Sequence, residues 1–187
     1  TDYDLDRPLY DTIEIPGPFF TVCHLSNRLY APLQVSHVLS ADDLVYSDLM
    51  NLGSNRHEHF HADTRAPNAT AAPNDIFSGG GEQEDRGHVF SYLDGATVMA
   101  GFWSFTFSNM FAQPGQLNRF SWKDLEVGVR NLIKTTGGTA VVHTGALFLN
   151  RNASGQLEPM ESKDIETLRT ERMTQWKSYA LNKEKNR

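Results

Sequence analysis

Two short hydrophobic runs near the start of the chain have the composition of β-strands. They are FFTVCHL, residues 19–25, and LQVSHVL, residues 33–39, and a short polar stretch separates them. Runs rich in β-branched and aromatic side chains with such a break between them predict a hairpin or two adjacent strands. Residues 1–17, which contain several acids and prolines, predict an extended arm that lies on or off the domain.

Small and polar residues then replace the hydrophobic ones. Residues 51–87 are mostly Asn, Gly, Pro, Ala, Asp and His, which predicts a long loop, and such loops inside a domain are usually functional or disordered. The aromatic-rich stretch at residues 98–111 predicts core in preference to a platform for stacking on bases. Its central aromatic residues are Phe102, Trp103, Phe105 and Phe107.

Helical spacing is clearest at residues 121–134. Ser121 can cap this predicted helix, and apolar residues recur along one of its faces: Trp122, Leu125, Val129, Leu132 and Ile133. Residues 139–150, which follow a pair of glycines, predict a strand.

From Glu161 to about Leu181 the chain predicts a charged amphipathic helix, which is either a surface helix or a docking element. We find no internal repeat and no second domain. The predicted organisation is therefore an extended arm at residues 1–17, one domain at residues 18–160 and a C-terminal helix at residues 161–187.

Composition indicates a globular protein without a disulfide framework. Hydrophobic residues make up 39% of the chain and aromatic residues 11%, and no apolar run is long enough to span a bilayer. One cysteine, Cys23, cannot form an internal disulfide, which favours a reducing or organellar compartment. The net charge of −6 disfavours a non-specific nucleic-acid coat. A compact basic cleft stays compatible with it, because a local arginine cluster can outweigh net charge at a site.

The histidine-rich segment HEHFH invites a zinc site, with His57, His59 and His61 as ligands. Their spacing puts them on one side of an extended strand, and no nearby Cys or further His completes four ligands. An exposed polar loop is therefore the favoured interpretation. Other histidines fall inside predicted strands and are expected to be packed: His24, His37 and His143.

His88, at the end of the segment GGGEQEDRGH, is a candidate general base, metal ligand or surface histidine, because its side chain titrates near neutral pH. Glu126 and Arg130 are four residues apart and share a face of the predicted helix, where a solvated ion pair is the simplest interpretation. Asn118 and Arg119 stand just before that helix, where the helix N-terminus favours an anion.

Three segments together resemble the DNA/RNA non-specific endonucleases, the ββα-metal (His-Me finger) family that includes endonuclease G. They are DRGH at 85–88, SNMFAQPGQLNRFSWKDLE at 108–126 and TGALF at 144–148. The family has an asparagine about thirty residues after the histidine, and then a tryptophan and a leucine-glutamate pair on a helix. Here thirty positions separate His88 from Asn118, and eight separate Asn118 from Glu126.

Upstream, Arg56, Phe60 and Asp63 match the family's spacing of an arginine, an aromatic residue and an aspartate, so the resemblance covers roughly residues 18–150. It implies an α+β fold, the ββα-metal (His-Me finger) nuclease fold, with a central mostly antiparallel sheet flanked by helices. In that fold the histidine ends a strand, and the helix brings the asparagine and the glutamate against it.

The resemblance also implies a role for each matched residue. His88 is the general base that takes a proton from the attacking water. Asn118 is the direct protein ligand of one Mg²⁺, with Mn²⁺ as an alternative ion, and Glu126 orients water bound to that ion. Asp85 positions the motif. The arginines implied in phosphate binding and charge stabilisation are Arg56, Arg86 and Arg130, and Arg119 is a further candidate for substrate binding.

The function implied is a Mg²⁺-dependent, sugar-non-specific endonuclease that cuts DNA and RNA to 5′-phosphate and 3′-hydroxyl ends. Contacts to phosphate, sugar and metal carry no base information, so little sequence preference is expected. Candidate partners are nucleic acid, a second copy of the chain, and a larger complex docked through the C-terminal helix. No membrane span is expected. The likeness to endonuclease G favours mitochondria, with secretion as the alternative.

The chain departs from the family pattern at identifiable positions. VFSY follows His88 where the family has a small or apolar residue and then alanine-proline, and alanines stand at 112 and 146 where the family has prolines. No later strands, which the family usually adds, are expected after residue 150. These departures support an alternative: a nuclease-fold subunit with weak or lost catalysis, retained as a structural or binding component of a larger complex.

Overall fold

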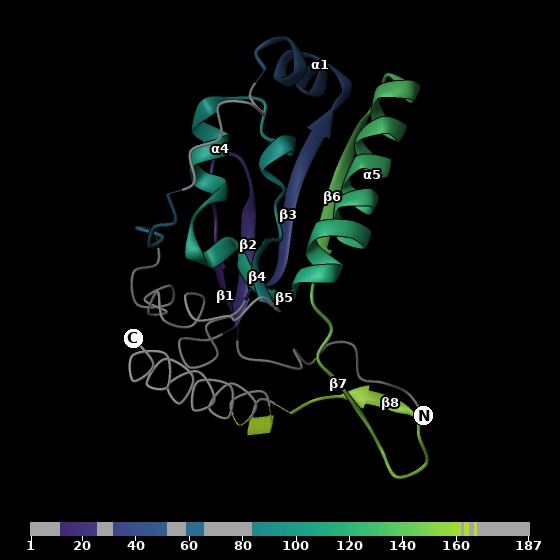
Figure 1. Ribbon diagram of the computed structural model, residues 1–187. Coiled ribbons are helices and arrows are strands. Elements are labelled where there is room, and N and C mark those ends of the chain that lie inside the picture. Colours follow the sequence, from purple (N-terminus) through teal and green to yellow (C-terminus); the bar gives the residue numbers. More distant parts are fainter. Residues whose placement is uncertain are drawn as a thin grey trace, which may run out of the picture.

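A four-stranded antiparallel sheet is the centre of the fold (Figure 1). The computed structural model describes residues 12–25, 32–51, 59–65, 84–161, 163–164 and 167. The strand order is β1-β2-β3-β6. The strands are β1 (Thr12–Ile15), β2 (Thr21–Leu25), β3 (Pro32–Ser40) and β6 (Thr139–Gly145). The predicted pair of adjacent strands is confirmed as β2 and β3, and residues 12–15 of the expected arm pair with β2.

One face of this sheet is buried and the other is open within the described residues. Val35, His37 and Leu39 are buried and alternate along β3 with residues that are half-buried or exposed, because successive side chains of a strand point to opposite faces. On the open face Val141 of β6 lies opposite Val38, and both are more than half exposed. Among the described residues, the other elements therefore pack on the face that carries Val35, His37 and Leu39.

The prediction that His143 is packed in the core is wrong. His143 lies on the open face of β6, opposite Ser36, and it is exposed. Its Nδ1 lies 2.8 Å from Ser36 Oγ and 3.1 Å from Gln34 Nε2. His24 and His37 lie on the buried face as predicted, at 1% and 5% exposure.

Helices α1 (Ala41–Leu49) and α5 (Lys123–Thr136) cover one end of the buried face (Figure 1). Ser40 caps α1 by accepting a hydrogen bond from the Asp43 amide. The α5 helix ends at Gly137, whose φ of 66° is left-handed and suits glycine. A small core joins the two helices to the sheet, and its buried members are Leu39, Leu44 and Ile133.

The predicted start of the helix at Ser121 is wrong. A π-helical segment, η4 (Leu117–Trp122), runs directly into α5, so Ser121 lies inside a continuous helical stretch and caps nothing. The predicted apolar face is only partly confirmed, because Leu125 is 57% exposed and Leu132 is 65% exposed. The extra residue of the π-turn shifts the phase of the helix, and polar side chains occupy part of the buried face of α5.

A second, two-stranded sheet is formed by β4 (Glu84–His88) and β5 (Met110–Pro114), paired antiparallel. Residues 84–87, predicted as part of a long loop, are therefore strand. Between the two strands the chain forms η2 (Tyr92–Asp94), α4 (Val98–Ser104) and η3 (Phe107–Asn109). The prediction that residues 98–111 form core is only partly confirmed, because Phe105 and Phe107 are buried whereas Phe102 is 47% exposed. The core beneath these elements has as its buried members Ile15, Phe20, Val22, Val35, Val89 and Phe90, and Trp103 packs against it partly buried.

The strand predicted at 139–150 is two strands. β6 ends at Gly145, where a Cβ would overlap the carbonyl oxygen of Leu33, and β7 (Leu149–Arg151) pairs instead with β8 (Leu157–Pro159). This hairpin extends from the lower end of the molecule in Figure 1. Most of the predicted C-terminal helix lies outside the described residues. None of the described helices has the length and apolar character required to cross a bilayer.

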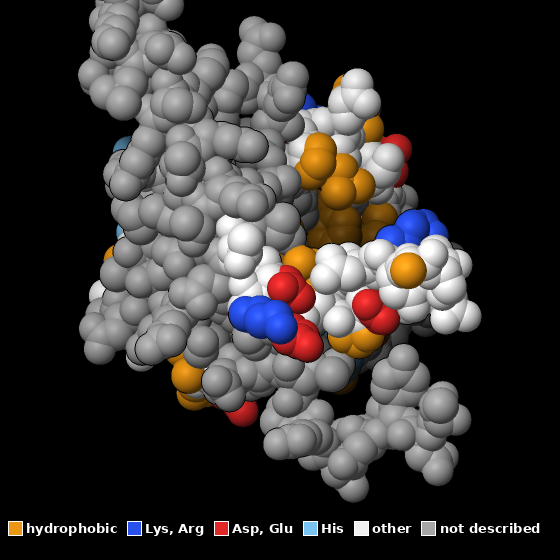
Figure 2. Space-filling view, turned by 90° about the horizontal axis from the view of Figure 1, so that it is seen from below, with side chains coloured by type: hydrophobic (Ala, Val, Ile, Leu, Met, Phe, Trp, Pro, Cys, Tyr) orange, Lys and Arg blue, Asp and Glu red, His pale blue; other side chains and the backbone are white. Residues whose placement is uncertain are grey.

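Charges of both signs lie together on the surface. From below, the described side chains show arginine or lysine next to aspartate or glutamate, beside a hollow lined by hydrophobic side chains (Figure 2).

Candidate active site

His88 stands at the end of β4, opposite Met110 of β5. It is 8% exposed, and its ring makes an edge contact with Phe105 at a centroid distance of 4.8 Å. Phe60 lies beside Phe105, and the centroid of its ring is 6.2 Å from that of His88. These aromatic neighbours restrict how the imidazole can rotate.

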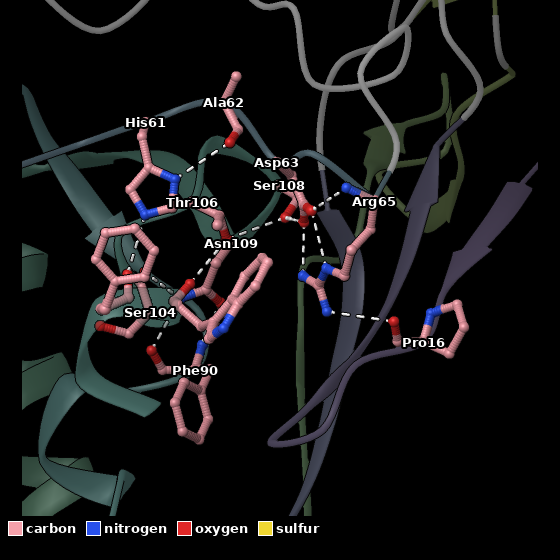
Figure 3. Close-up of polar contacts among 12 residues, drawn as sticks. Pro16, His61, Ala62, Asp63, Arg65, Phe90, Ser104, Thr106, Ser108 and Asn109 are labelled. Atoms are coloured by element: carbon pink, nitrogen blue, oxygen red, sulfur yellow. Dashed lines mark hydrogen bonds and ion pairs between the residues drawn. The ribbon is translucent and has the colours of Figure 1, made fainter. Parts of the chain in front are cut away.

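Asn109 fixes the backbone that leaves His88 (Figure 3). Its backbone oxygen accepts a hydrogen bond from Val89 N at 3.0 Å, and its Oδ1 accepts one from Phe90 N at 2.7 Å. Its Nδ2 donates to Phe90 O at 3.0 Å and to Ser104 O at 2.8 Å. Asn109 is fully buried, so this side chain replaces water as the partner of the amide and carbonyl of Phe90, two residues after His88, and of the carbonyl of Ser104. The sequence showed Asn109 as part of a motif but suggested no role for it.

A buried ion pair holds the neighbouring segment (Figure 3). Asp63, at 0% exposure, accepts hydrogen bonds from Arg65 Nε at 2.8 Å and Arg65 Nη2 at 2.6 Å, and also from Ser108 Oγ. Burial alone would raise the pKa of Asp63, but the hydrogen bonds from Arg65 and Ser108 outweigh it and lower the pKa. The guanidinium of Arg65 lies 4.9 Å from the Trp103 ring. Residues 63–65 are thereby tied to the stretch that carries Asn109.

Asn118 is bound to the first residue of the DRGH motif. Its Nδ2 donates to Asp85 Oδ2 at 3.0 Å. Because a carboxylate only accepts hydrogen bonds, the NH₂ side of the amide faces Asp85 and the Oδ1 atom faces away. Asp85 therefore sets which way the Asn118 amide points.

Arg119, predicted to bind substrate, binds Asp85 in this structure. Its Nε and Nη2 donate to the two carboxylate oxygens at 2.8 Å and 2.6 Å. The hydrogen bond from Arg119, followed by the one from Asn118, lowers the pKa of Asp85 against the effect of burial. The role expected for Asp85, positioning and not reaction, agrees with these contacts.

Glu126 and Arg130 are not a solvated ion pair, contrary to the simplest interpretation of their spacing. Arg130 is 7% exposed, and its Nη1 lies 3.9 Å from Glu126 Oε2. Ser91 Oγ donates to Glu126 Oε2 at 3.0 Å. Burial raises the pKa of Glu126, and the hydrogen bond from Ser91 and the charge of Arg130 oppose that rise.

The helical stretch η4–α5 therefore contacts the chain on both sides of His88. Asn118 binds Asp85, three residues before the histidine, and Glu126 binds Ser91, three residues after it. Both predicted metal-site residues are thus hydrogen-bonded to the chain close to the predicted base, Asn118 to Asp85 within β4 and Glu126 to Ser91 just after that strand.

Of the two remaining predicted arginines, the structure describes Arg86. The guanidinium carbon of Arg86 lies 4.5 Å from the centre of the Phe60 ring, a cation–π contact that orients the planar guanidinium. Arg56 lies outside the described residues.

No group of three or more His, Cys, Asp or Glu that could hold a metal occurs among the described residues. His57 lies outside them. His61 is engaged elsewhere, with Nδ1 3.1 Å from Ala62 O and Nε2 3.2 Å from Phe102 O, as Figure 3 shows for Ala62.

The chain is similar to known nucleases in sequence and in fold. The model of a family described as DNA/RNA non-specific endonuclease matches residues 15–184. Of the solved structures, 105 chains match. One of them comes from the crystal structure of the EndoG/EndoGI complex, with a TM-score of 0.57 and 23% sequence identity. That match covers 79% of this chain and 58% of the other. At this identity the likeness shows the fold, which is the predicted ββα-metal fold. No curated protein matches the chain.

Proposed function

The chain belongs to the DNA/RNA non-specific endonuclease family, and on that premise we propose that it is an active, Mg²⁺-dependent endonuclease. It hydrolyses phosphodiester bonds of DNA and RNA and leaves 5′-phosphate and 3′-hydroxyl ends. The observation that carries the proposal is the pair of hydrogen bonds from Asn118 to Asp85 and from Ser91 to Glu126, on either side of His88.

His88 acts as the general base. Hydrolysis of a phosphodiester needs a deprotonated water in line with the leaving oxygen, and a neutral imidazole can take that proton near pH 7, an effect of about 10²–10⁴-fold. The edge contact with Phe105 and the backbone hydrogen bonds of Asn109 to the next two residues support this role. They hold the imidazole in one orientation, which is what proton transfer to a fixed group requires.

The donor set fits a hydrated Mg²⁺. The ion prefers oxygen ligands and keeps several waters, so it does not need a cage of protein side chains. The Oδ1 atom of Asn118 faces away from Asp85, which leaves an amide oxygen for direct binding, and Glu126 would hold the ion through water. When bound, the ion supplies positive charge that offsets the charge of the phosphate.

Arg86 supplies a further positive charge at the phosphate. A guanidinium matches phosphate oxygens with two parallel hydrogen bonds, and the Phe60 ring holds that of Arg86 in one plane. Arg56 is proposed for the same task on the family spacing alone. Because these contacts address phosphate and not bases, little sequence preference is expected.

A second candidate function is a structural or binding subunit with weak or lost catalysis. The observation that favours it is the exposure of apolar side chains on α5 and on the open sheet face, among them Leu125, Leu132 and Val141. Exposed apolar side chains on each of these two surfaces favour a protein partner, either a second copy or a larger complex. The mitochondrial compartment stays a prediction.

Cleavage assays separate the two candidates. The full chain is incubated with supercoiled plasmid, single-stranded DNA and RNA in Mg²⁺, in Mn²⁺ and in EDTA, and the product ends are identified by enzymatic labelling. We expect cleavage of all three substrates with either ion, none in EDTA, and 5′-phosphate ends. Absence of cleavage with both ions, from protein that is folded by circular dichroism, would favour the structural subunit.

A further inference from the structure

We propose that Asp94 is a positioning residue of the active site, which with Ser91 holds Arg130 inside the protein and through it places Glu126. Arg130 then acts as a buried cation and not as a phosphate contact. The catalytic consequence rests on the proposed nuclease function, whereas the placement of Arg130 does not.

Asp94 is the nearest partner of the Arg130 guanidinium. Arg130 Nη1 lies 2.8 Å from Asp94 Oδ1, 3.2 Å from Ser91 Oγ and 3.9 Å from Glu126 Oε2. The hydroxyl of Ser91 accepts from Arg130 and donates to Glu126, so it links the cation to the carboxylate at the site. The four residues form one hydrogen-bonded group, which we call the Arg130 cluster: Ser91, Asp94, Glu126 and Arg130.

The Arg130 cluster is closed to solvent on the side of the sheet. The side chains of Arg130 and Asp94 are each 9% exposed. The second oxygen of Asp94, Oδ2, lies 3.1 Å from Nε2 of His37, which is itself 5% exposed on β3. Asp94 therefore has a partner on each oxygen, and the guanidinium of Arg130 has little surface left for a phosphate.

A buried arginine needs acceptors, because an unpaired charge in the interior is strongly unfavourable. If Asp94 were removed, the nearest remaining carboxylate for Arg130 would be that of Glu126. The guanidinium would then move toward Glu126 or toward solvent, and either movement would displace the carboxylate that is proposed to orient water. This is why Asp94 affects the site without touching substrate.

The Arg130 cluster gives a structural role to Ser91, which lies in the segment VFSY where the chain departs from its family. Val89 and Phe90 are fixed to Asn109 by their backbone amides. Ser91, the third residue of VFSY, and Asp94, two residues after its end, supply the side chains that reach α5. The altered sequence after His88 thus positions Glu126 and Arg130 on α5 through Ser91. It is therefore compatible with retained activity.

The test compares Asp94→Ala and Asp94→Asn with Asp48→Ala. Asp48 is the matched control because it pairs with Lys134, one turn beyond Arg130 on the same helix, at 2.5 Å on the surface. The first measurement is the NMR spectrum of the arginine guanidinium groups, with the Arg130 signals identified from the spectrum of Arg130→Lys. We expect protected Arg130 signals in the wild type, their loss in Asp94→Ala, and no change in Asp48→Ala.

The second measurement is the split between kcat and KM for plasmid cleavage. We expect Asp94→Ala to lower kcat about 10- to 100-fold, as outer residues that orient a metal site commonly do, with KM nearly unchanged. Asp94→Asn keeps an acceptor oxygen for Arg130 and should recover part of kcat. It also serves as the test variant if Asp94→Ala does not fold. An unchanged kcat in the alanine variant, with the Arg130 signals lost, would overturn the positioning role.

The third measurement is binding of a short DNA duplex in EDTA. Since Arg130 is not a phosphate contact, Arg130→Gln should bind close to wild type, whereas Arg86→Gln should bind more weakly and with a smaller salt dependence. Equal weakening by the two variants would overturn the proposal. If the wild type does not cleave nucleic acid at all, the proposed function fails, and the guanidinium spectra still decide whether Asp94 holds Arg130.

Discussion

Asn109→Ala should destabilise the protein more than most polar substitutions. The side chain makes three hydrogen bonds, one accepted from Phe90 N and two donated to Phe90 O and Ser104 O. Asn109 and Ser104 are fully buried and Phe90 is 2% exposed, so water cannot replace the lost partner without opening the core. At about 1 kcal/mol of net stability for each hydrogen bond, the loss is about 3 kcal/mol.

The assay is chemical denaturation followed by circular dichroism, together with thermal unfolding. A loss of about 3 kcal/mol corresponds to a fall in Tm of about 6–12 °C for a chain of this size. The control is Asn131→Ala, which removes an exposed asparagine from α5 and should change stability by less than about 0.5 kcal/mol. Because Asn109 fixes the two residues after His88, cleavage by folded Asn109→Ala at 25 °C should also fall. A loss of stability below about 1 kcal/mol would refute the reasoning.

Three further predictions concern single residues. Gly87→Ala should cost about 1–3 kcal/mol in denaturant unfolding, because a Cβ there would overlap the side-chain amide of Gln113; unchanged stability would show that Gln113 can move aside. Glu126→Gln should abolish most cleavage. Because burial raises the pKa of Glu126, the charged carboxylate lowers the stability of the wild type as pH rises through that raised pKa, so the Tm of the variant at pH 8 should equal or exceed that of the wild type. A Tm difference between variant and wild type that is less favourable to the variant at pH 8 than at pH 4 would contradict this. Asp63→Asn should cost about 3–5 kcal/mol at neutral pH because it breaks the buried pair with Arg65. Since the pKa of Asp63 is lowered, the deficit should shrink as pH falls below about 4, and a deficit independent of pH would be the contrary result.

The parts of the fold that follow from local pattern were predictable from the sequence. The β-branched runs predicted β2 and β3, and helical spacing predicted the body of α5. The helix α1 was not predicted, although Ser40 and Asp43 stand at the capping-box spacing and bind one another in the structure. The start of α5 could not be predicted, because a π-turn leaves no period of its own in the sequence.

The site was predictable where motif spacing defines it and not where distant elements meet. The sequence linked His88, Asn118 and Glu126 through their spacing. It could not show that Arg130 is buried, because its partner Asp94 lies on another element, 36 positions away. The exposure of His143 was hidden for a similar reason: a strand pattern shows two faces but not which of them is covered.

The most direct test of the central claim is the rate of plasmid cleavage in Mg²⁺ by His88→Ala, beside wild type and His143→Ala. The control removes an exposed histidine from the open face of β6 and should keep the wild-type rate. The account predicts a loss of about 10²–10⁴-fold for His88→Ala, the contribution of a general base. Cleavage by His88→Ala at the wild-type rate would contradict the assignment of His88 as the base.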